Sequence, residues 1–247
     1  MIDSHVDANI INEELFFKEV CTTAIKQGVK GLTFCHTLED KNINKSKEFF
    51  INFNESNNFL YQQKLMYYGE LNFFKGIELI SDLSNIEEFL RIINLYQFDY
   101  IKVSINPIHF SDSEKLQREI ESLRFLKYFN SVCQVEPLAD WIYSGKKSFR
   151  SYKVDLLDEL LKKLINSYKS IELNTNLLRK ESLGENIYSL LKRYRKLGGN
   201  LICLSSRTKT VEKVCCNFAV YRELLVQLGF KYTTHYINLT PTHDSLR

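Results

Sequence analysis

The stretch NEELFFKEVCTTAIKQGVKGLTFC, residues 12–35, reads as one helix, one turn and one strand in that order. Asn12 is a favourable N-cap, and the acidic Glu13 and Glu14 stand in the first turn, where the helix dipole favours negative charge. The apolar residues that predict one buried helix face are Leu15, Phe16, Val20 and Ala24. Gly28 ends the predicted helix, and the apolar run 31–35 predicts a strand.

Similar apolar runs alternate with amphipathic helical stretches along the whole chain. The predicted strands are 1–5, 31–35, 73–80, 100–105, 131–135, 170–174 and 201–204, with a short extra strand at 232–237. Such alternation favours a parallel sheet covered by helices. Both a barrel of about seven strand–helix units and an open doubly wound sheet fit it. No glycine-rich phosphate loop follows the first strand, which argues against a nucleotide-binding Rossmann domain.

Composition limits the classes of protein that the chain can represent. Hydrophobic residues make up 44% of the 247 residues, enough for a sizeable core, and the net charge is only +3. This balance argues against nucleic acid as a partner, since a nucleic-acid binder shows a basic stripe. No apolar run reaches the length of a membrane span, which argues against a membrane partner. Only three prolines occur and no Pro-, Gly- or Ser-rich linker divides the chain, so we predict one domain over residues 1–247.

The six cysteines indicate a cellular compartment. They form no CxxC pair, and the N-terminus lacks a basic and apolar leader, so we expect free thiols in a cytoplasmic protein. Two of them, Cys215 and Cys216, lie within a predicted last helix, 211–228, where packing is their expected role.

Polar residues follow or interrupt most of the predicted strands. His5 and His36 stand where the first two strands end, and Glu78 interrupts an apolar strand. A histidine at a strand end is often a structural hydrogen-bonding residue rather than a ligand. A buried carboxylate needs a partner, and Arg207 or Lys209 after the seventh strand could supply it. In a barrel these side chains would meet at one rim, where barrel enzymes hold their active sites.

Five segments of the chain, taken in order, resemble the motifs of the PHP phosphoesterase family in its histidinol-phosphatase branch. They are Ile2-Asp3-Ser4-His5-Val6-Asp7, the segment 28–36 ending in Cys35-His36, Gly76-Ile77-Glu78, Ile171 to Lys180, and Leu197 to Phe230. The resemblance covers nearly the whole chain and implies a distorted (β/α)7 TIM-like barrel. It also implies hydrolysis of phosphate monoesters, in histidine biosynthesis, at a cluster of up to three Zn, Mn or Fe ions, with Arg179 contacting the phosphate.

The chain departs from the family at most of the metal-binding positions. The replacements are Asp7 for the second histidine of the first motif, Cys35 for an aspartate, Asn106 for a histidine (with His109 nearby), Cys133-Gln134 for Gly-His, and Arg207-x-Lys209 for the final Asp-x-His. An arginine cannot lose its charge, and at about 4 Å from a divalent ion it is repelled by roughly 8 kcal/mol at an effective dielectric of about 20. We therefore expect the full cluster to be absent and at most one divalent ion to remain, on His5, Asp7 and Glu78.

Three functions remain open at this stage. The first is hydrolysis of histidinol phosphate or a similar small phosphorylated metabolite. The second is a catalytically inactive protein that binds a phosphorylated or anionic small molecule through Arg179, Arg207 and Lys209. If these cations instead replace the charge of the metal ions and hold a phosphate directly, His36 or His5 could act as acid or base. Arg207 could also simply form a salt bridge to Glu78 or Asp7. The third is a scaffold for protein interactions, for which the aromatic segment Phe49 to Phe59 is the place to look.

Overall fold

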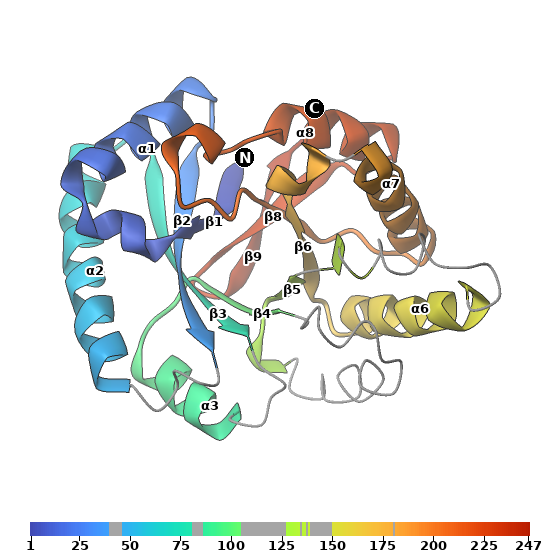
Figure 1. The fold of residues 1–247 in the computed structure, drawn as a ribbon, viewed down its shortest axis with the longest axis horizontal. Helices are drawn as coiled ribbons and strands as arrows, with labels where there is room; N and C mark the ends of the chain where they lie inside the picture. Colours follow the sequence, from blue (N-terminus) through green and yellow to red (C-terminus); the bar gives the residue numbers. More distant parts are fainter. Residues whose placement is uncertain are drawn as a thin grey trace.

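The computed structural model describes residues 1–39, 46–80, 86–104, 127–133, 135–136, 138, 150–179 and 181–247. Within them, seven parallel strands form one sheet in chain order (Figure 1). The strands are β1 (Ile2–Asp7), β2 (Gly31–Glu39), β3 (Asn72–Ile80), β4 (Tyr100–Ser104), β5 (Ser131–Cys133), β6 (Ser170–Asn174) and β7 (Ile202–Ser205).

The sheet curls until its first and last strands meet. A parallel bridge joins Val6 to Thr208, the Asp7 N–H donates to the Thr208 carbonyl at 3.0 Å, and the Arg207 N–H donates to the His5 carbonyl at 2.8 Å. The predicted barrel is therefore confirmed, and the open doubly wound alternative is wrong.

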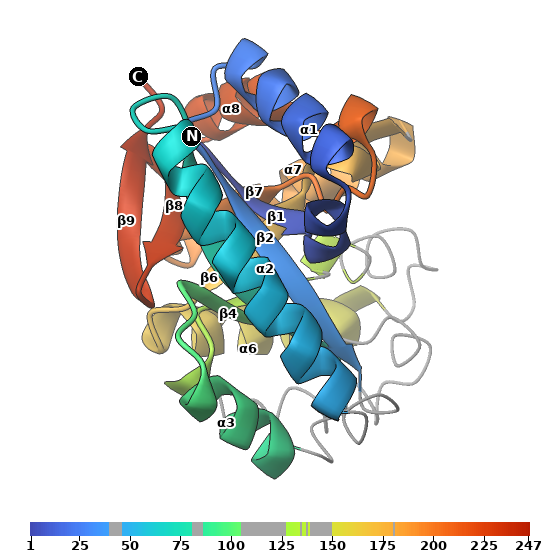
Figure 2. The ribbon, with the colours of Figure 1, turned by 90° about the vertical axis from the view of Figure 1, so that its left-hand side faces the viewer.

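Helices surround the sheet on its outer side (Figures 1 and 2). The α-helices are α1 (Glu14–Lys26), α2 (Ser46–Met66), α3 (Ile86–Leu95), α6 (Arg150–Asn166), α7 (Glu181–Lys196) and α8 (Phe218–Gln227). Short 3-10 helices are η1 (Ala8–Asn12), η6 (Thr175–Arg179) and η7 (Val211–Lys213). None of the helices in the described part of the chain combines the length and apolar character that crossing a membrane requires.

The two faces of the strands have opposite character, which places the polar residues inside the barrel. On β4, Ile101 and Val103 join the apolar core that the helices cover, whereas Tyr100, Lys102 and Ser104 alternate with them. Strand β6 repeats the pattern, with Ile171 and Leu173 in the core and polar residues between them. The main apolar core thus lies between the sheet and the helices, because successive side chains of a strand point to opposite faces.

A β-hairpin follows the last helix and covers the end of the barrel where the strands begin. It consists of β8 (Tyr232–Ile237) and β9 (Thr240–Ser245), which pair antiparallel. Tyr236 stacks on Tyr100 with ring centroids 5.3 Å apart and donates to the Asn130 carbonyl at 3.0 Å. Figure 2 shows the hairpin beside the start of the chain. The predicted extra strand 232–237 is confirmed, whereas its partner β9 was not foreseen.

Three local predictions are wrong in whole or in part. Asn12 ends η1 and does not cap α1, which starts at Glu14. The buried face of α1 contains Val20 and Ala24 as predicted, but it also contains Phe17, whereas Leu15 is exposed. The predicted helix 211–228 is broken, because only its second half, α8, is α-helical. In the aromatic segment 49–59, Phe53 is buried and Phe59 packs against the core, so these two rings contribute to packing.

Candidate functional site

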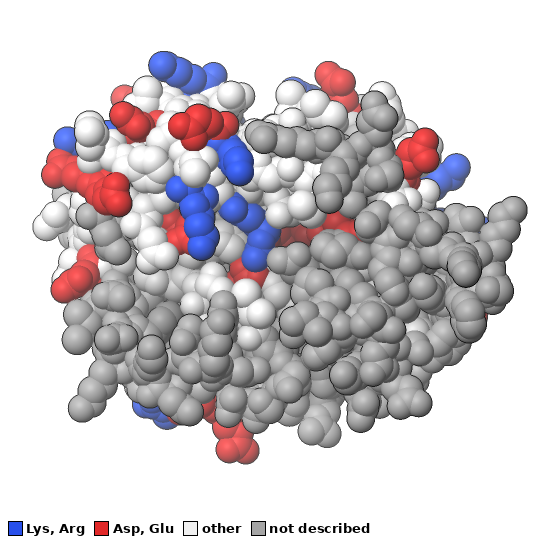
Figure 3. Space-filling model, in the orientation of Figure 1, with Lys and Arg blue, Asp and Glu red and all other residues white. Residues whose placement is uncertain are grey.

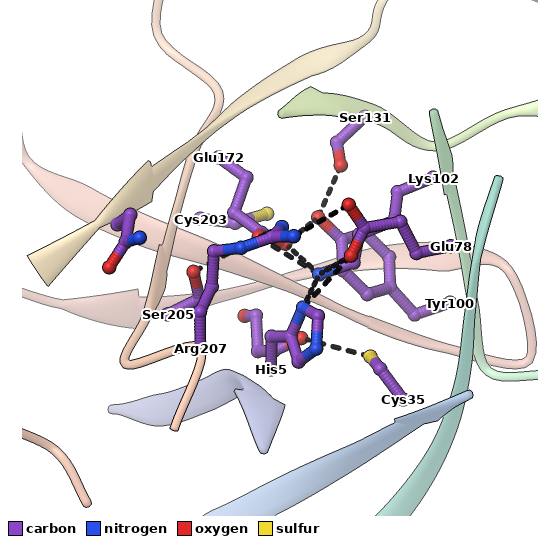
Figure 4. Close-up of polar contacts among 12 residues, drawn as sticks. His5, Cys35, Glu78, Tyr100, Lys102, Ser131, Glu172, Cys203, Ser205 and Arg207 are labelled. Atoms are coloured by element: carbon purple, nitrogen blue, oxygen red, sulfur yellow. Dashed lines mark hydrogen bonds and ion pairs between the residues drawn. The ribbon is translucent and has the colours of Figure 1, made fainter. Parts of the chain in front are cut away.

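Five charged or titratable side chains meet on the axis of the barrel (Figure 4). We call them the barrel cluster: His5 from β1, Glu78 from β3, Lys102 from β4, Glu172 from β6, and Arg207 just after β7. Four of the five are buried, and only 13% of the Arg207 side chain is exposed. The strand register explains the meeting, because Glu78 and Lys102 are direct partners across β3 and β4.

Lys102 is the centre of the cluster. Its Nζ lies 2.9 and 2.7 Å from the two carboxylate oxygens of Glu172 and 2.6 Å from Nδ1 of His5. The nearer oxygen of Glu78 is 4.0 Å away. Burial alone would lower the pKa of Lys102, but the surrounding acidic groups, Cys35 and Glu172 first, outweigh it and raise that pKa. The side chain is therefore an ammonium ion with no exposed surface.

Arg207 covers the cluster from the side of the barrel mouth. Its Nη2 donates to Oε1 of Glu78 at 2.6 Å, and its Nη1 donates to Oε1 of Glu172 at 3.3 Å. The residue has a positive φ of 46°, which is uncommon for a residue with a side chain. The partner that Glu78 was predicted to need is thus Arg207, and the predicted salt bridge between them is present.

The two carboxylates are ionised and well supplied with donors. Glu172 also accepts from the Tyr100 hydroxyl at 2.9 Å and from Ser205 Oγ at 3.0 Å, and Ser104 Oγ donates to Glu78. Burial pushes the pKa of Glu78 upward, but the charges of Arg207 and Lys102 together hold it well below its ordinary value. Burial also raises the pKa of Glu172, but the positive charges of Lys102 and then Arg207 outweigh it, so this pKa is lowered as well.

His5 is neutral in this setting. Burial, followed by repulsion from Lys102 and Arg207, lowers its pKa to about 4. An ammonium group has no lone pair, so at 2.6 Å from Lys102 the His5 Nδ1 must accept the hydrogen bond. The remaining ring proton therefore sits on Nε2. A neutral imidazole beside two carboxylates and two cations gives the barrel cluster a net charge of zero.

This donor set does not fit the metal cluster that the family resemblance implies. A divalent ion about 4 Å from the Lys102 ammonium would be repelled by roughly 8 kcal/mol at an effective dielectric of about 20, and Arg207 would add to this. Across the described ranges, no three His, Cys, Asp or Glu side chains are grouped so that they could hold a metal ion.

The other predicted site residues lie apart from the cluster or beyond the described residues. Asp7 caps η1 by accepting from the Asn9 N–H at 2.9 Å, and the mostly exposed Lys209 lies 3.5 Å from Asp7. The His36 ring packs edge-on against Phe53, and burial lowers its pKa to about 4. Those whose side chains lie outside the described residues are Asn106, His109, Gln134 and Arg179; the backbone of Arg179 ends η6.

Sequence reasoning missed Lys102 altogether and included Glu172 only as part of the motif segment Ile171 to Lys180. The signal was present, since Tyr100, Lys102 and Ser104 alternate with apolar residues, as do Ser170 and Glu172. Attention to strand ends alone overlooks charged residues in the middle of a strand. A lysine at the centre of a five-residue buried strand is rare enough to mark a polar barrel interior.

Comparisons with known proteins identify relatives of the chain. It is 25% identical over 176 residues to a probable histidinol-phosphatase of Clostridium acetobutylicum, covering 62% of this chain and 69% of that protein. It is 23% identical over 245 residues to a histidinol-phosphatase of Lactococcus lactis, covering 92% of this chain and 89% of the relative. No protein-family model matches the chain.

A solved structure confirms the type of fold. The histidinol phosphate phosphatase of Lactococcus lactis, crystallised with zinc, L-histidinol and phosphate, superposes with a TM-score of 0.71 at 16% identity, covering 98% of this chain and 97% of that one. At this identity the likeness shows the shared fold. Sequence motifs, curated relatives and fold agree, and the chain is therefore a relative of the PHP-type histidinol-phosphatases.

Proposed function

We propose that this histidinol-phosphatase-like protein binds a small phosphorylated or anionic metabolite at the mouth of its barrel and does so without a metal centre. The observation that carries the proposal is the pairing of both buried carboxylates with Lys102 and Arg207. In the family the corresponding region holds the metal ions that activate water, and here their charge is supplied by side chains. Hydrolysis of histidinol phosphate is the function that the relatives' names suggest. The barrel cluster argues against the metal-dependent mechanism that the family resemblance implies for it.

The cations near the barrel mouth favour an anionic ligand. A guanidinium has five N–H donors, and the ion pairs of Arg207 engage two of its three nitrogens. Lys209, with 79% of its side chain exposed, lies two residues further along the chain. Figure 3 shows Lys and Arg atoms gathered near the centre of this face, next to acidic atoms. Arginine suits phosphate because its planar fork can contact two oxygens at once.

Ligand-induced stabilisation of the protein in EDTA tests the binding proposal. We expect inorganic phosphate and histidinol phosphate to raise the Tm, and about 100 Kd of ligand should give a rise of roughly 5–10 °C. Lys209→Gln should reduce that rise, whereas Lys213→Gln, which changes an exposed lysine of η7, should leave it unchanged. A Tm that neither anion moves would contradict the proposal.

Enzyme assays separate binding from catalysis. With a chromogenic phosphate monoester and with histidinol phosphate, we expect no turnover above background after addition of Zn²⁺, Mn²⁺ or Mg²⁺. Turnover that depends on added metal and disappears in His5→Ala would instead establish a metal-dependent phosphatase.

A further inference from the structure

We infer that the outer surface of α7 and α8 is the interface of a homodimer, in which α7 of one chain packs antiparallel against α7 of a second copy. The two helices are neighbours on the outside of the barrel, and their side chains line one groove (Figure 1). The inference does not depend on the proposed function, because the groove lies between the helices and the barrel cluster lies inside the sheet.

The groove between α7 and α8 has a volume of about 610 Å³ and an apolar lining. Tyr188 on α7 borders it on one side, and Val220 and Leu224 on α8 border it on the other. Tyr188 is 41% exposed and Val220 is 52% exposed, so both side chains contact water in the single chain. Burying such side chains against a partner is favourable, and exposed apolar groups that line a groove are typical of interaction sites.

The charges of the groove favour a partner that brings positive charge. Among the described residues that line it, the only charged ones are Glu185 and Glu223. Further along α7 stands the exposed Lys192, whose Nζ lies 5.8 Å from the centre of the Tyr188 ring. The chain itself therefore carries, on a helix that borders the groove, the cation and the apolar ring that the groove would accept.

The spacing of residues along α7 makes this surface self-complementary. Glu185, Tyr188 and Lys192 follow one another at intervals of three and four residues, which places them on one face of the helix, and all three are exposed. Glu185 and Lys192 stand at equal distances, about 5 Å along the helix axis, on either side of the midpoint between positions 188 and 189. A two-fold axis through that midpoint brings Glu185 of each chain level with Lys192 of the other.

The same axis places the two Tyr188 rings at the centre of the interface, beside the apolar groove of the opposite chain. Burial of these apolar groups supplies the affinity, and the two symmetric ion pairs fix the register. A parallel arrangement would place glutamate beside glutamate and lysine beside lysine. The charges of α7 therefore select the antiparallel arrangement.

The mass of the protein in solution tests the dimer. We expect sedimentation equilibrium to show a dimer that dissociates on dilution, and we expect Tyr188→Ser to raise its Kd by about tenfold or more. Tyr61→Ser, which changes an exposed tyrosine of α2, is the matched control and should leave the Kd unchanged.

Charge reversal tests the antiparallel register. We expect Glu185→Lys alone and Lys192→Glu alone each to weaken the dimer, because each substitution puts two pairs of like charges into the interface. Mixed in equal amounts, the two variants should form a heterodimer, since all the facing charges are then opposite. Glu159→Lys, which reverses an exposed charge on α6, should leave the natural dimer unchanged.

Three results would overturn the inference. One is a natural protein that stays monomeric up to about 1 mM, and another is a dimer whose Kd does not respond to Tyr188→Ser. The third is a mixture of Glu185→Lys and Lys192→Glu that associates no better than either variant alone. Circular dichroism checks the fold of each variant, and Val220→Ser replaces Tyr188→Ser if that variant does not fold.

Discussion

The charged side chains of the barrel cluster form their ion pairs with one another. Glu172 contacts both cations, and Arg207 contacts both carboxylates. A buried ion pair contributes little net stability compared with apolar residues of the same size, but removing one member leaves an uncompensated charge in the interior. Removing one member should therefore lower the free energy of unfolding by much more than the net contribution of its ion pair.

Replacing Arg207 should reveal this dependence. We expect Arg207→Gln to lower the free energy of unfolding by about 3 kcal/mol at neutral pH, because Glu78 loses its nearest cation. Urea unfolding at pH 7 measures the change. Lys209→Gln, which removes an exposed cation 3.5 Å from Asp7, should change it by less than about 1 kcal/mol. Equal effects of the two substitutions would contradict the importance of the buried pair.

Glu136 is a buried acid outside the barrel cluster, and it should make stability depend on pH. It accepts from the backbone N–H of Asn174, and burial raises its pKa to about 7 from the ordinary 4.5. A raised pKa means that the folded state holds the proton more tightly, so this residue destabilises the fold as pH rises from about 4.5 through 7.

The substitution Glu136→Gln removes that penalty and keeps an acceptor for Asn174. We expect it to stabilise the protein by on the order of 2 kcal/mol at pH 8 and to have little effect at pH 4.5, as measured by urea unfolding at both values. Exposed Glu223→Gln is the control and should show no such difference between the two pH values. A gain of equal size at both pH values would show that titration of Glu136 is not the cause.

The sequence allowed part of this residue-level arrangement to be predicted. The need of Glu78 for a cationic partner follows from its place in an apolar strand, and Arg207 fulfils it. That Lys209 lies with Asp7, outside the cluster, could not be predicted, because its place depends on where the chain turns after Arg207. The long reach of Lys102 to Glu172, two strands away, depends on the curvature of the sheet and not on sequence spacing.

At the scale of elements, local patterns predict strands better than helix ends. Strand β6 has the predicted bounds, whereas the last predicted helix is interrupted at Cys215 and Asn217, both of which have positive φ. The Cys215 N–H donates to the buried carboxylate of Asp3, a residue 212 positions away. This hydrogen bond overrides the helix propensity of the segment. Because its partner is so distant in sequence, the residues around Cys215 do not reveal it.

The pairing of β2 with β3 depends on a close approach at Gly76. A Cβ atom there would overlap Sγ of Cys35, the residue opposite it in the register. We expect Gly76→Ala to destabilise the protein by about 1–3 kcal/mol through overpacking, as measured by urea unfolding.

Removal of the obstructing sulfur tests that cause. In a Cys35→Ala background, Gly76→Ala should be less destabilising by about 1 kcal/mol or more, which gives a coupling energy in a double-mutant cycle. Strictly additive effects would mean that another contact, such as the Thr33 methyl at 3.0 Å, limits the site.

For the whole molecule, the sequence established the alternation of strands and helices but not the closure of the sheet. Closure depends on backbone hydrogen bonds between β1 and the residues after β7, about 200 positions apart, and the curl of a sheet is not encoded in any one element. The family resemblance supplied what the pattern left open.

The thiols provide a measure of how tightly the whole barrel is closed. Five of the six free cysteines are buried and only Cys216 is partly accessible. Burial raises the pKa of Cys21, Cys35 and Cys203 to about 12, so few reactive thiolates exist at pH 8. We expect a thiol reagent to modify one cysteine rapidly in the native protein and all six after unfolding, with Cys216→Ser abolishing the rapid phase. Rapid modification of two or more native cysteines would contradict the closed barrel.

The position of Lys102 has a consequence for the life of the protein in a cell. A metalloenzyme must take up its metal ion from the surroundings after synthesis. It stays incomplete when the metal is scarce or when a chelator binds it. Here the central positive charge is the ammonium group of Lys102, so it is present as soon as the chain has been synthesised. Folding of this chain should therefore proceed equally well in metal-depleted and metal-rich media.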